Sequence, residues 1–568
     1  MSVFVRPMLL LLGLVLGATA WAEGRPPAAA VASAHPLATQ AGMEILEQGG
    51  NAFDAAVAVT AALAVVEPYS SGLGGGGFWL LHRAEDGKEV FLDGRETAPS
   101  AAHRDMFLSE DGQVIPGLSI NGPLSAGIPG VPAALDHLAR HYGRLPLAVS
   151  LAPAIRLARE GFPVDGHYRR LATFRAEVMR YYPETARLFL LEGEPPPLGH
   201  VIRQPELARV LQAIARHGRD GFYRGWVAER LVDGVRQAGG IWSLDDLAAY
   251  RVKEREPLRG SYRGIRLTLA PPPSSGGVAL LTLLNILAPF DLEAMAEADR
   301  VHLLVEAMRR VYRDRAQYLG DADFVEIPLA RLTHPWYAAG LRAGISLRRA
   351  TPSEWLPGPD ELPEEGPHTT HFSILDGEGN RVAATVTINY PFGSGFVPPG
   401  TGVLLNDEMD DFSAKPGVPN AYGLVGAEAN AIAPGKRPLS SMSPTFVDDG
   451  ERLGILGTPG GSRIITMVLL GILDYAAGRD PQDWVARPRF HHQYLPDAIQ
   501  YEPGALSETL IQTLKDRGHS VQALGGRYGN MQAILWDRRT DRVTAASDPR
   551  GVGEAVVRRL EPAKDVGH

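Results

Sequence analysis

The chain changes character at Gly366-Pro367-His368-Thr369-Thr370-His371-Phe372-Ser373-Ile374-Leu375-Asp376. Before this point lies an acidic, Pro-rich segment, residues 351–368, which cannot readily form a helix or a central strand because proline lacks the backbone N–H. From Thr369 onward polar and apolar residues alternate, which is typical of a β-strand. A Gly-containing turn at 376–380 leads to a second alternating run, 381–389, so the sequence predicts a β-hairpin.

The loop length of this hairpin decides which side chains face each other. A three-residue loop at Gly377-Glu378-Gly379 sets Thr369 opposite Thr387 and joins the polar faces of the two strands. A two-residue loop would oppose Thr369 to Ile388 and mix the faces, so we expect the longer loop. A threonine with a second hydroxyl beside it is a candidate nucleophile, whose base is its own amine if the chain is cut before it. From the hairpin alone, a strand rich in threonine for structural reasons is the simpler interpretation.

The composition is that of an ordinary globular protein. The 568 residues are 45% hydrophobic and 21% charged, and the length allows roughly two to four domain-sized units. The formal net charge is −9 without long runs of one sign, so nothing indicates a nucleic-acid partner. The chain has no cysteine, which excludes disulfides, thiol catalysis and thiolate metal sites.

The N-terminus has the pattern of a secretory signal. Arg6 ends a short basic region, residues 8–16 are apolar, and Ala20-Trp21-Ala22 fits a cleavage site before Glu23. The apolar core is shorter than the ~20 residues that cross a bilayer. We therefore expect residues 1–22 to be a signal peptide cleaved after Ala22 and the protein to be exported, either periplasmic or secreted; an uncleaved anchor is the alternative.

Apolar periodicity predicts several helices. Residues 35–48 and 51–66 are expected to form two packed helices, the second almost wholly buried, and 127–250 reads mostly as helices. Two further helices are expected at 278–287 and 299–319. We expect these segments to serve as scaffold.

Two Gly-rich turns and one arginine leave alternatives open. At residues 72–77 no Gly-Lys-Ser/Thr follows, which favours close backbone packing over a phosphate cradle. Gly460 and Gly461 lie at a strand-to-helix turn, where consecutive N–H groups suit an anion or a developing oxyanion; an ordinary tight turn is the alternative. Arg95 leaves a strand through a turn, where an arginine usually makes a structural ion pair rather than binding a ligand.

Taken together, the motifs resemble those of the gamma-glutamyltranspeptidase family of N-terminal-nucleophile hydrolases. The resemblance covers residues 32–557, nearly the whole mature chain. The motifs are His35-Pro36-Leu37-Ala38, the loop Glu67-Pro68 to Gly77, Asp93-Gly94-Arg95-Glu96, the loop 271–277, Thr369-Thr370-His371, Met409-Asp410-Asp411-Phe412-Ser413, Arg437 to Pro444, and Pro459-Gly460-Gly461-Ser462-Arg463.

The resemblance implies an α/β fold, a four-layer α/β/β/α sandwich made as one precursor that cuts itself. The cut is expected between His368 and Thr369, giving two intertwined subunits: a large one, residues 23–368, and a small catalytic one, 369–568. Thr369 would be the nucleophile in both the cut and turnover, with its freed α-amine as base in turnover. Thr387 would orient its hydroxyl.

The family's other site residues carry over by position. Gly460 and Gly461 would form the oxyanion hole. A γ-glutamyl group keeps a free α-amine and α-carboxylate, so its pocket needs both signs of charge. Its carboxylate would be met by Arg95, Ser440 and Ser441, its ammonium by Asn389, Glu408 and Asp411, and Tyr422 would be the gating aromatic of a lid. Position 408 is Glu where some relatives have Gln.

The leading interpretation is therefore an autoprocessing gamma-glutamyltransferase and glutathione hydrolase. It would cleave glutathione and other γ-glutamyl compounds through an ester on Thr369, pass the group to water, an amino acid or a dipeptide, and need no cofactor and no metal. A glutaryl cephalosporin acylase and a non-catalytic periplasmic amino-acid or peptide-binding protein are the alternatives. A serine hydrolase or a zinc enzyme fits less well, because Gly-x-Ser-x-Gly and His-Glu-x-x-His are absent and the pair His491-His492 lacks ligand spacing.

Overall fold

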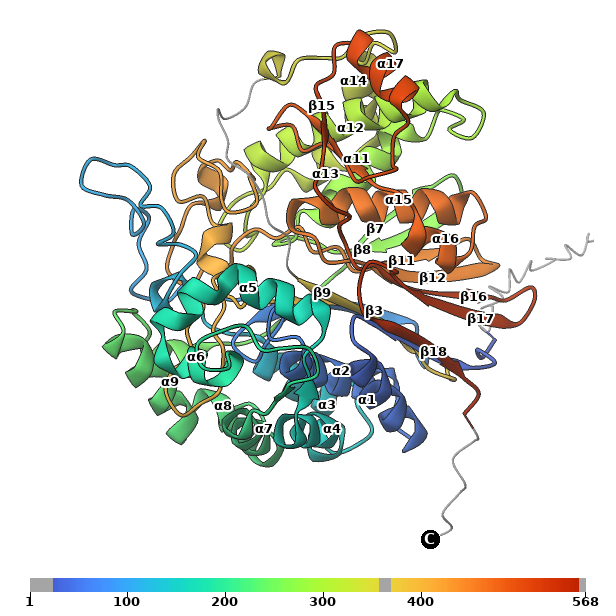
Figure 1. The fold of residues 1–568 in the computed structure, drawn as a ribbon. Helices are drawn as coiled ribbons and strands as arrows, with labels where there is room; N and C mark the ends of the chain where they lie inside the picture. Colours follow the sequence, from blue (N-terminus) through green and yellow to red (C-terminus); the bar gives the residue numbers. More distant parts are fainter. Residues whose placement is uncertain (1–23, 357–368, 561–568) are drawn as a thin grey trace, which may run out of the picture.

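Two β-sheets lie face to face between two layers of helices in the computed structural model, which describes residues 24–356 and 369–560 (Figure 1). The α/β/β/α layering predicted for the chain is confirmed. The expected signal peptide, residues 1–22, lies outside the described residues, as do 357–368 of the acidic segment with the expected cut after His368, and 561–568.

The first sheet contains the predicted hairpin in its centre. All its neighbouring strands are antiparallel, and Leu375 pairs with Arg381 and Ile374 with Val382, which is the register of the three-residue loop. This prediction is confirmed. In spatial order the strands are β18 (Glu554–Arg558), β1 (Ala29–Ser33), β9 (Thr370–Leu375), β10 (Arg381–Thr387), β2 (Gly76–Arg83), β3 (Lys88–Gly94) and β6 (Lys253–Arg255).

The second sheet covers the inner face of the first. Leu80 and Phe91 of the first sheet share one apolar core with Ile455 and Ile534 of the second, so the two sheets pack through interdigitating side chains. In spatial order its strands are β17 (Arg542–Ser547), β16 (Gln532–Asp537), β12 (Arg452–Gly457), β11 (Thr445–Asp448), β8 (Ile265–Leu269) and β7 (Leu258–Tyr262).

Helices cover the outer face of each sheet (Figure 1). On the first sheet lie α1 (Pro36–Glu47) and α2 (Ala52–Val66); α2 is buried along its whole length, as its Ala- and Val-rich sequence predicted. Its start is fixed by a capping box in which Asn51 and Asp54 satisfy each other's backbone N–H groups. On the second sheet lie α11 (Gly276–Leu287), α12 (Glu297–Tyr318) and α15 (Ile464–Ala476).

The remaining elements surround these layers. The long helical region predicted at 127–250 is confirmed. It contains α3 (Val131–His141), α4 (Leu147–Glu160), α5 (Gly166–Tyr181), α6 (Pro183–Phe189), α7 (Pro205–His217), α8 (Asp220–Tyr223), α9 (Gly225–Gln237) and α10 (Leu244–Ala249), with the short strands β4 (Phe162–Pro163) and β5 (Val201–Ile202). Elsewhere lie α13 (Leu329–Leu332), α14 (Pro335–Ala343), α16 (Pro481–Ala486), α17 (Glu508–Asp516), β13 (Phe490–His491), β14 (Ile499–Tyr501) and β15 (Val521–Ala523).

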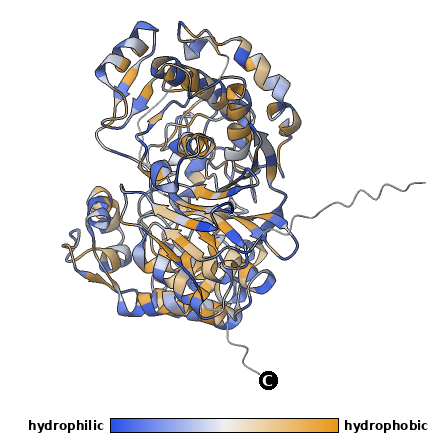
Figure 2. Cartoon of the chain, turned by 90° about the vertical axis from the view of Figure 1, so that its right-hand side faces the viewer, coloured by the Kyte–Doolittle hydropathy of each residue, from blue (hydrophilic) through white to orange (hydrophobic). Residues whose placement is uncertain are grey.

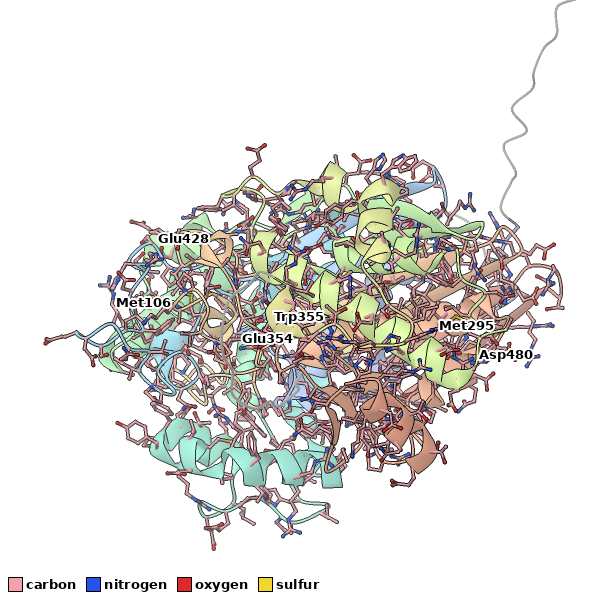
Figure 3. All side chains as sticks on the ribbon, turned by 90° about the horizontal axis from the view of Figure 1, so that it is seen from above. Met106, Met295, Glu354, Trp355, Glu428 and Asp480 are labelled. Atoms are coloured by element: carbon pink, nitrogen blue, oxygen red, sulfur yellow. The ribbon has the colours of Figure 1, made fainter. Side chains whose placement is uncertain are left out.

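Apolar residues follow the central strands and the inward sides of the helices (Figure 2). In residues 24–356 and 369–560, no helix has both the length and the apolar character of a membrane span. The last element before residue 357 is the short 3-10 helix η2 (Ser353–Trp355), where Figure 3 labels Glu354 and Trp355.

The Gly-rich turn before β2 packs backbone against backbone, as its sequence predicted. A Cβ added to Gly75 would collide with the carbonyl oxygen of Thr387, and one added to Gly74 with that of Leu404. Only glycine therefore allows this turn to lie against the end of β10. The turn thus helps to hold Thr387 in place.

Candidate active site

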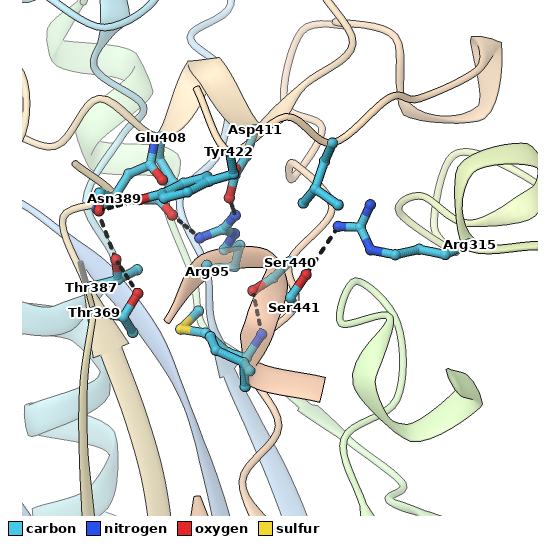
Figure 4. A pocket seen from close by; sticks show the side chains of 14 residues that line it. Arg95, Arg315, Thr369, Thr387, Asn389, Glu408, Asp411, Tyr422, Ser440 and Ser441 are labelled. Atoms are coloured by element: carbon cyan, nitrogen blue, oxygen red, sulfur yellow. Dashed lines mark hydrogen bonds and ion pairs between the residues drawn. The ribbon is translucent and has the colours of Figure 1, made fainter. Parts of the chain in front are cut away.

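The hairpin places two threonine hydroxyls side by side at the end of the first sheet (Figure 4). Thr369 Oγ1 lies 3.5 Å from Thr387 Oγ1, and the backbone N–H of Asn389 donates to Thr387 Oγ1 at 2.7 Å. Thr387 already accepts from Asn389, so its own proton remains for Thr369. The pair is buried, and it follows directly from the register of β9 and β10.

The rest of the polar face of the hairpin points into the space between the sheets and has a structural explanation. His371 bonds the hydroxyl of Thr385 at 2.8 Å and that of Ser373 at 3.3 Å, and Ser373 donates to the carbonyl of Gln532. Burial lowers the pKa of His371 to about 3, so the ring is neutral. These residues link the two sheets.

The Gly-Gly turn lies where β12 meets α15. Gly460 has φ +145° and Gly461 φ +53°, conformations that favour glycine. A Cβ added to Gly461 would lie 2.6 Å from the ring of Tyr422, so the aromatic packs directly on this turn. The structure therefore brings the predicted oxyanion turn and the predicted lid residue into contact.

Arg95 is fully buried, and its guanidinium is held on every side. It pairs with Glu408 through Nη1 and with Asp411 through Nη2, and its Nε donates to the carbonyl of Pro438 at 3.2 Å. Burial alone would lower its pKa, but the carboxylates of Glu408, Asp411 and Glu96 raise it above the usual range. The residues expected to meet opposite ends of a substrate are thus in direct contact with one another.

Three buried carboxyl groups share this one guanidinium. Burial raises the pKa of Glu96 to about 8, that of Glu408 well above its usual value, and that of Asp411 as well, while Arg95 opposes each shift. Glu408 Oε2 is buried and makes no hydrogen bond within the described part of the chain. The charge of this cluster therefore allows it to bind one more cationic group.

A second buried arginine enters the same site from α12. Arg315 donates from Nε to Ser275 Oγ at 3.0 Å and from Nη2 to Ser441 Oγ at 3.1 Å, and burial lowers its pKa. In the described residues it has no carboxylate within ion-pair distance. Sequence reasoning missed Arg315 because it treated this helix as scaffold; an arginine facing the apolar side of a helix was the available signal.

Loop residues complete the site. The hydroxyl oxygen of Ser440 accepts a hydrogen bond from the backbone N–H of Met442. The backbone carbonyl of Ser440 accepts one from the hydroxyl of Ser275. Tyr422 is buried and donates from its hydroxyl to the carbonyl of Asn389 at 2.6 Å. Asn389 adopts φ +74°, and its Nδ2 donates to the carbonyl of Asp407 at 3.1 Å, so its Oδ1 is the atom that can accept.

Most of these residues line one cavity, here called the first cavity, which measures about 300 Å³ with its open mouth included and which Figure 4 shows. Gly460 instead lines a second cavity, which Thr369 also reaches. Within the described residues, no group of three or more His, Cys, Asp and Glu side chains could hold a metal ion. The lining of the first cavity that sequence reasoning predicted is Thr369, Thr387, Gly461, Arg95, Asn389, Glu408, Asp411, Tyr422, Ser440 and Ser441.

Comparisons with known proteins identify the family of the chain. Residues 38–558 match the family model described as Gamma-glutamyltranspeptidase. The chain is 44% identical over 531 residues to the glutathione hydrolase proenzyme of Escherichia coli (strain K12), covering 92% of this chain and 90% of the relative.

Solved structures are also similar. A cephalosporin acylase from Bacillus halodurans superposes with a TM-score of 0.82 at 30% identity, covering 94% of this chain and 96% of the other. The gamma-glutamyltranspeptidase of Helicobacter pylori superposes with a TM-score of 0.56 at 40% identity, covering 57% of this chain and 94% of the matched one.

Proposed function

The chain belongs to the gamma-glutamyltranspeptidase family, and we propose that Thr369 is the nucleophile with which it first cuts itself and then acts on γ-glutamyl amides. It is an autoprocessed gamma-glutamyltransferase and glutathione hydrolase. The assignment of residues rests on the lining of the first cavity. There the Thr369 hydroxyl lies beside that of Thr387, and charged side chains of both signs line the same cavity.

In the proposed cut, Thr369 Oγ1 attacks the carbonyl carbon of His368. The peptide C–N bond breaks as the ester bond forms, and the hydroxyl proton passes to the departing nitrogen, which becomes the α-amine of Thr369. Water then hydrolyses the ester, which returns the hydroxyl and leaves a carboxylate on His368. The products are a large subunit, residues 23–368, and a small one, 369–568, which begins with a free α-amine. The name proenzyme, given to the E. coli relative, supports a processed precursor.

In the proposed turnover, the freed amine of Thr369 takes the proton from its own hydroxyl. Oγ1 attacks the γ-carbonyl, Thr387 orients it, and the N–H groups of Gly460 and Gly461 stabilise the negative oxygen of the tetrahedral intermediate. The amide C–N bond breaks and the leaving amine takes the proton. Water, an amino acid or a dipeptide then resolves the ester.

The charges of the first cavity support recognition of an α-amino acid. A substrate ammonium would lie beside the carboxyl groups of Glu408 and Asp411, and Glu408 Oε2 is available to accept its hydrogen bond. The substrate carboxylate would lie toward Arg315 and Ser441, with Arg95 between the two ends.

A glutaryl cephalosporin acylase is the second candidate, because the structure of a cephalosporin acylase superposes closely. A glutaryl group has no ammonium, so it would leave the buried carboxyl groups without a cation. The test compares γ-glutamyl-p-nitroanilide with glutaryl-p-nitroanilide. We expect the first to have the larger kcat/KM; preference for the glutaryl compound would overturn the choice.

The cut itself is tested by intact mass spectrometry with N-terminal sequencing of the smaller fragment. We expect that fragment to begin at Thr369 and the larger one to begin at Glu23, as signal cleavage after Ala22 predicts. A fully active, uncut chain would contradict the proposal. Because it is active, it would also exclude the alternative of a non-catalytic binding protein.

A further inference from the structure

The two arginines of the first cavity differ in how their charges are balanced. The guanidinium of Arg95 is paired with the carboxylates of Glu408 and Asp411. Arg315, on α12, is only 5% exposed and lines the same cavity (Figure 4). Among the described residues it has no carboxylate within ion-pair distance, and its Nη1 has no hydrogen-bond partner. Because arginine stays protonated inside proteins, Arg315 brings to the cavity a positive charge that no direct partner neutralises.

The contact between Arg315 and Ser441 decides which way the serine hydroxyl can donate. Arg315 Nη2 donates to Ser441 Oγ at 3.1 Å. A guanidinium has only donors, so the serine oxygen accepts and its own proton is left for another partner. In the described part of the chain this hydroxyl donates to no protein atom. A carboxylate in the first cavity, which Ser441 also lines, is a suitable acceptor for that proton.

The second contact of Arg315 supports the neighbouring serine through its backbone. Arg315 Nε donates to Ser275 Oγ at 3.0 Å, and the Ser275 hydroxyl donates to the carbonyl of Ser440 at 2.7 Å. The backbone N–H of Ser275 donates to the same carbonyl at 2.7 Å, and the N–H of Ser440 donates to the carbonyl of Pro273 at 2.8 Å. Arg315 therefore supports Ser441 directly and Ser440 through Ser275.

The same side of α12 also holds the Gly-Gly turn. Tyr312 donates from its hydroxyl to the carbonyl of Ser462, which directly follows Gly461. Tyr312 and Arg315 are three positions apart, so their side chains leave the helix on one side. The helix precedes the proposed cut, whereas Ser441 and Ser462 follow it. A helix of the proposed large subunit thus positions two loops of the proposed small subunit.

We propose that Arg315 is a positioning residue for the carboxylate end of the substrate: it orients the Ser441 hydroxyl to donate to the α-carboxylate and, through Ser275, fixes the backbone of Ser440. The inference rests on the proposed function and gives α12 a part in its specificity. A substrate without the α-carboxylate would leave the Ser441 proton without an acceptor and the charge of Arg315 without a counterion.

A double-mutant cycle with Ser441 tests this role. In hydrolysis of γ-glutamyl-p-nitroanilide by the cut enzyme, we expect Arg315→Met to raise KM about tenfold or more, with a smaller change in kcat, because the hydroxyl loses its orientation. Ser441→Ala should raise KM by a similar factor. Since Arg315 acts through Ser441, the double variant should raise KM much less than the product of the two single effects. Effects that multiply would overturn the inference, as would a fall in kcat with KM unchanged.

A matched control on the same helix separates this role from a general effect on α12. Arg313 pairs with Asp314 at 3.3 Å and is not among the residues that line the first cavity. Arg313→Met should therefore leave KM equal to that of the unsubstituted enzyme. Thermal unfolding and the fraction of cut chain are measured for every variant. A lower Tm and a lower yield of cut enzyme, with KM unchanged, would assign Arg315 a structural role only.

A conservative variant keeps the test decisive if Arg315→Met gives no cut enzyme. Arg315→Lys then takes its place in the cycle, because lysine keeps the charge but cannot donate to both serines with the geometry of a guanidinium. The same pattern is expected, with KM raised and the effects of the two substitutions not multiplying. Multiplying effects would overturn the inference here as well.

Inhibition by L-glutamate gives a second readout that is independent of the chemical step. L-Glutamate has the same α-carboxylate as the substrate, so Arg315→Met should raise its Ki by about the same factor as KM. An unchanged Ki would overturn the inference. If the unsubstituted enzyme does not hydrolyse γ-glutamyl-p-nitroanilide, the proposed function has failed. If it does and the effects in the cycle multiply, only the role of Arg315 has failed.

Discussion

The hairpin β9–β10 and the loops around the first cavity are built in different ways. The hairpin belongs to a regular sheet, and its register is repeated by every backbone hydrogen bond of the ladder. The loops are held instead by single buried side chains. Asn406 donates to the carbonyls of Gly74 and Gly127 and accepts from the N–H groups of Gly127 and Glu408.

This difference suggests separate roles for the two regions, the hairpin in the chemical step and the loops in substrate binding. The hydrogen bonds of a ladder are made by the backbone, so the hairpin places Thr369, the proposed nucleophile, beside Thr387 through its register alone. The position of each loop depends on particular buried polar contacts, which are costly to leave unpaired. We therefore expect changes in the hairpin to alter the chemical step, and changes in the loops to alter binding and stability together.

The largest effect is expected at the hairpin. Thr369→Ala removes the hydroxyl proposed for both steps, so we expect an uncut chain and a loss of turnover of roughly 10⁴-fold or more. Thr369→Ser keeps a hydroxyl and should retain part of both. Denaturing gel electrophoresis and γ-glutamyl-p-nitroanilide hydrolysis measure the two; a Ser variant that stays wholly uncut would contradict a shared hydroxyl.

Arg95 tests the loop side of the comparison. Arg95→Ala leaves Glu408 and Asp411 buried without their cation, so we expect a stability loss of about 3–5 kcal/mol. Arg95→Lys keeps one charge without the fork and should raise KM, lowering kcat/KM by roughly 10²-fold. Thermal unfolding and steady-state kinetics measure these, with the exposed Arg216→Lys as control. An unchanged KM in Arg95→Lys would remove this residue from the substrate pocket.

The contact between the Gly-Gly turn and the lid can be tested by crowding it. Gly461→Ala places a methyl group against Tyr422 at a backbone conformation that favours glycine, so we expect kcat to fall roughly 10²-fold. The double variant Gly461→Ala, Tyr422→Ala separates two causes. Partial recovery of kcat would identify the collision, and no recovery would assign the loss to the backbone of the turn.

Thr387→Val probes the second hydroxyl of the hairpin with little change in shape. It removes the acceptor of the Asn389 N–H and the neighbour of Thr369 Oγ1, so we expect kcat to fall about tenfold. The KM for γ-glutamyl-p-nitroanilide should change less than kcat. A rise in KM with kcat intact would assign Thr387 to binding instead of to orientation of the nucleophile.

The smallest effect is a pH dependence of stability in the loops. Asp410 accepts from Ser119 and from the N–H of Ala421, and burial raises its pKa from 3.8 to about 7. Between these values the folded protein keeps a proton that the unfolded chain has lost. Its contribution to the free energy of unfolding therefore decreases as pH rises through this window and is constant above it. Asp410→Asn should gain a few degrees in Tm relative to the unsubstituted enzyme between pH 5 and pH 8; a constant Tm difference would contradict this account.

Much of the fold could be predicted because its signals are local. The alternation in 369–375 and 381–387 indicated the hairpin, the loop length indicated its register, and the apolar run of α2 indicated burial on all sides. The residues of the first cavity came from the family resemblance, and the structure brings all the described ones except Gly460 into that cavity. The cut after His368 stays a prediction.

Pairings between distant residues could not be predicted in this way. Sequence reasoning assigned Arg95 and Glu408 to opposite ends of a substrate, whereas the structure pairs them across 313 positions of the chain. Arg315 was missed because nothing in its helix indicates which loop it meets.

The sequence by itself determined the hairpin and the register that sets Thr369 beside Thr387, since backbone pairing and side-chain alternation depend on neighbours along the chain. Only the tertiary structure decided which charges meet in the first cavity. Those contacts depend on how four layers pack, and burial then raises the pKa of Glu96, Glu408 and Asp411.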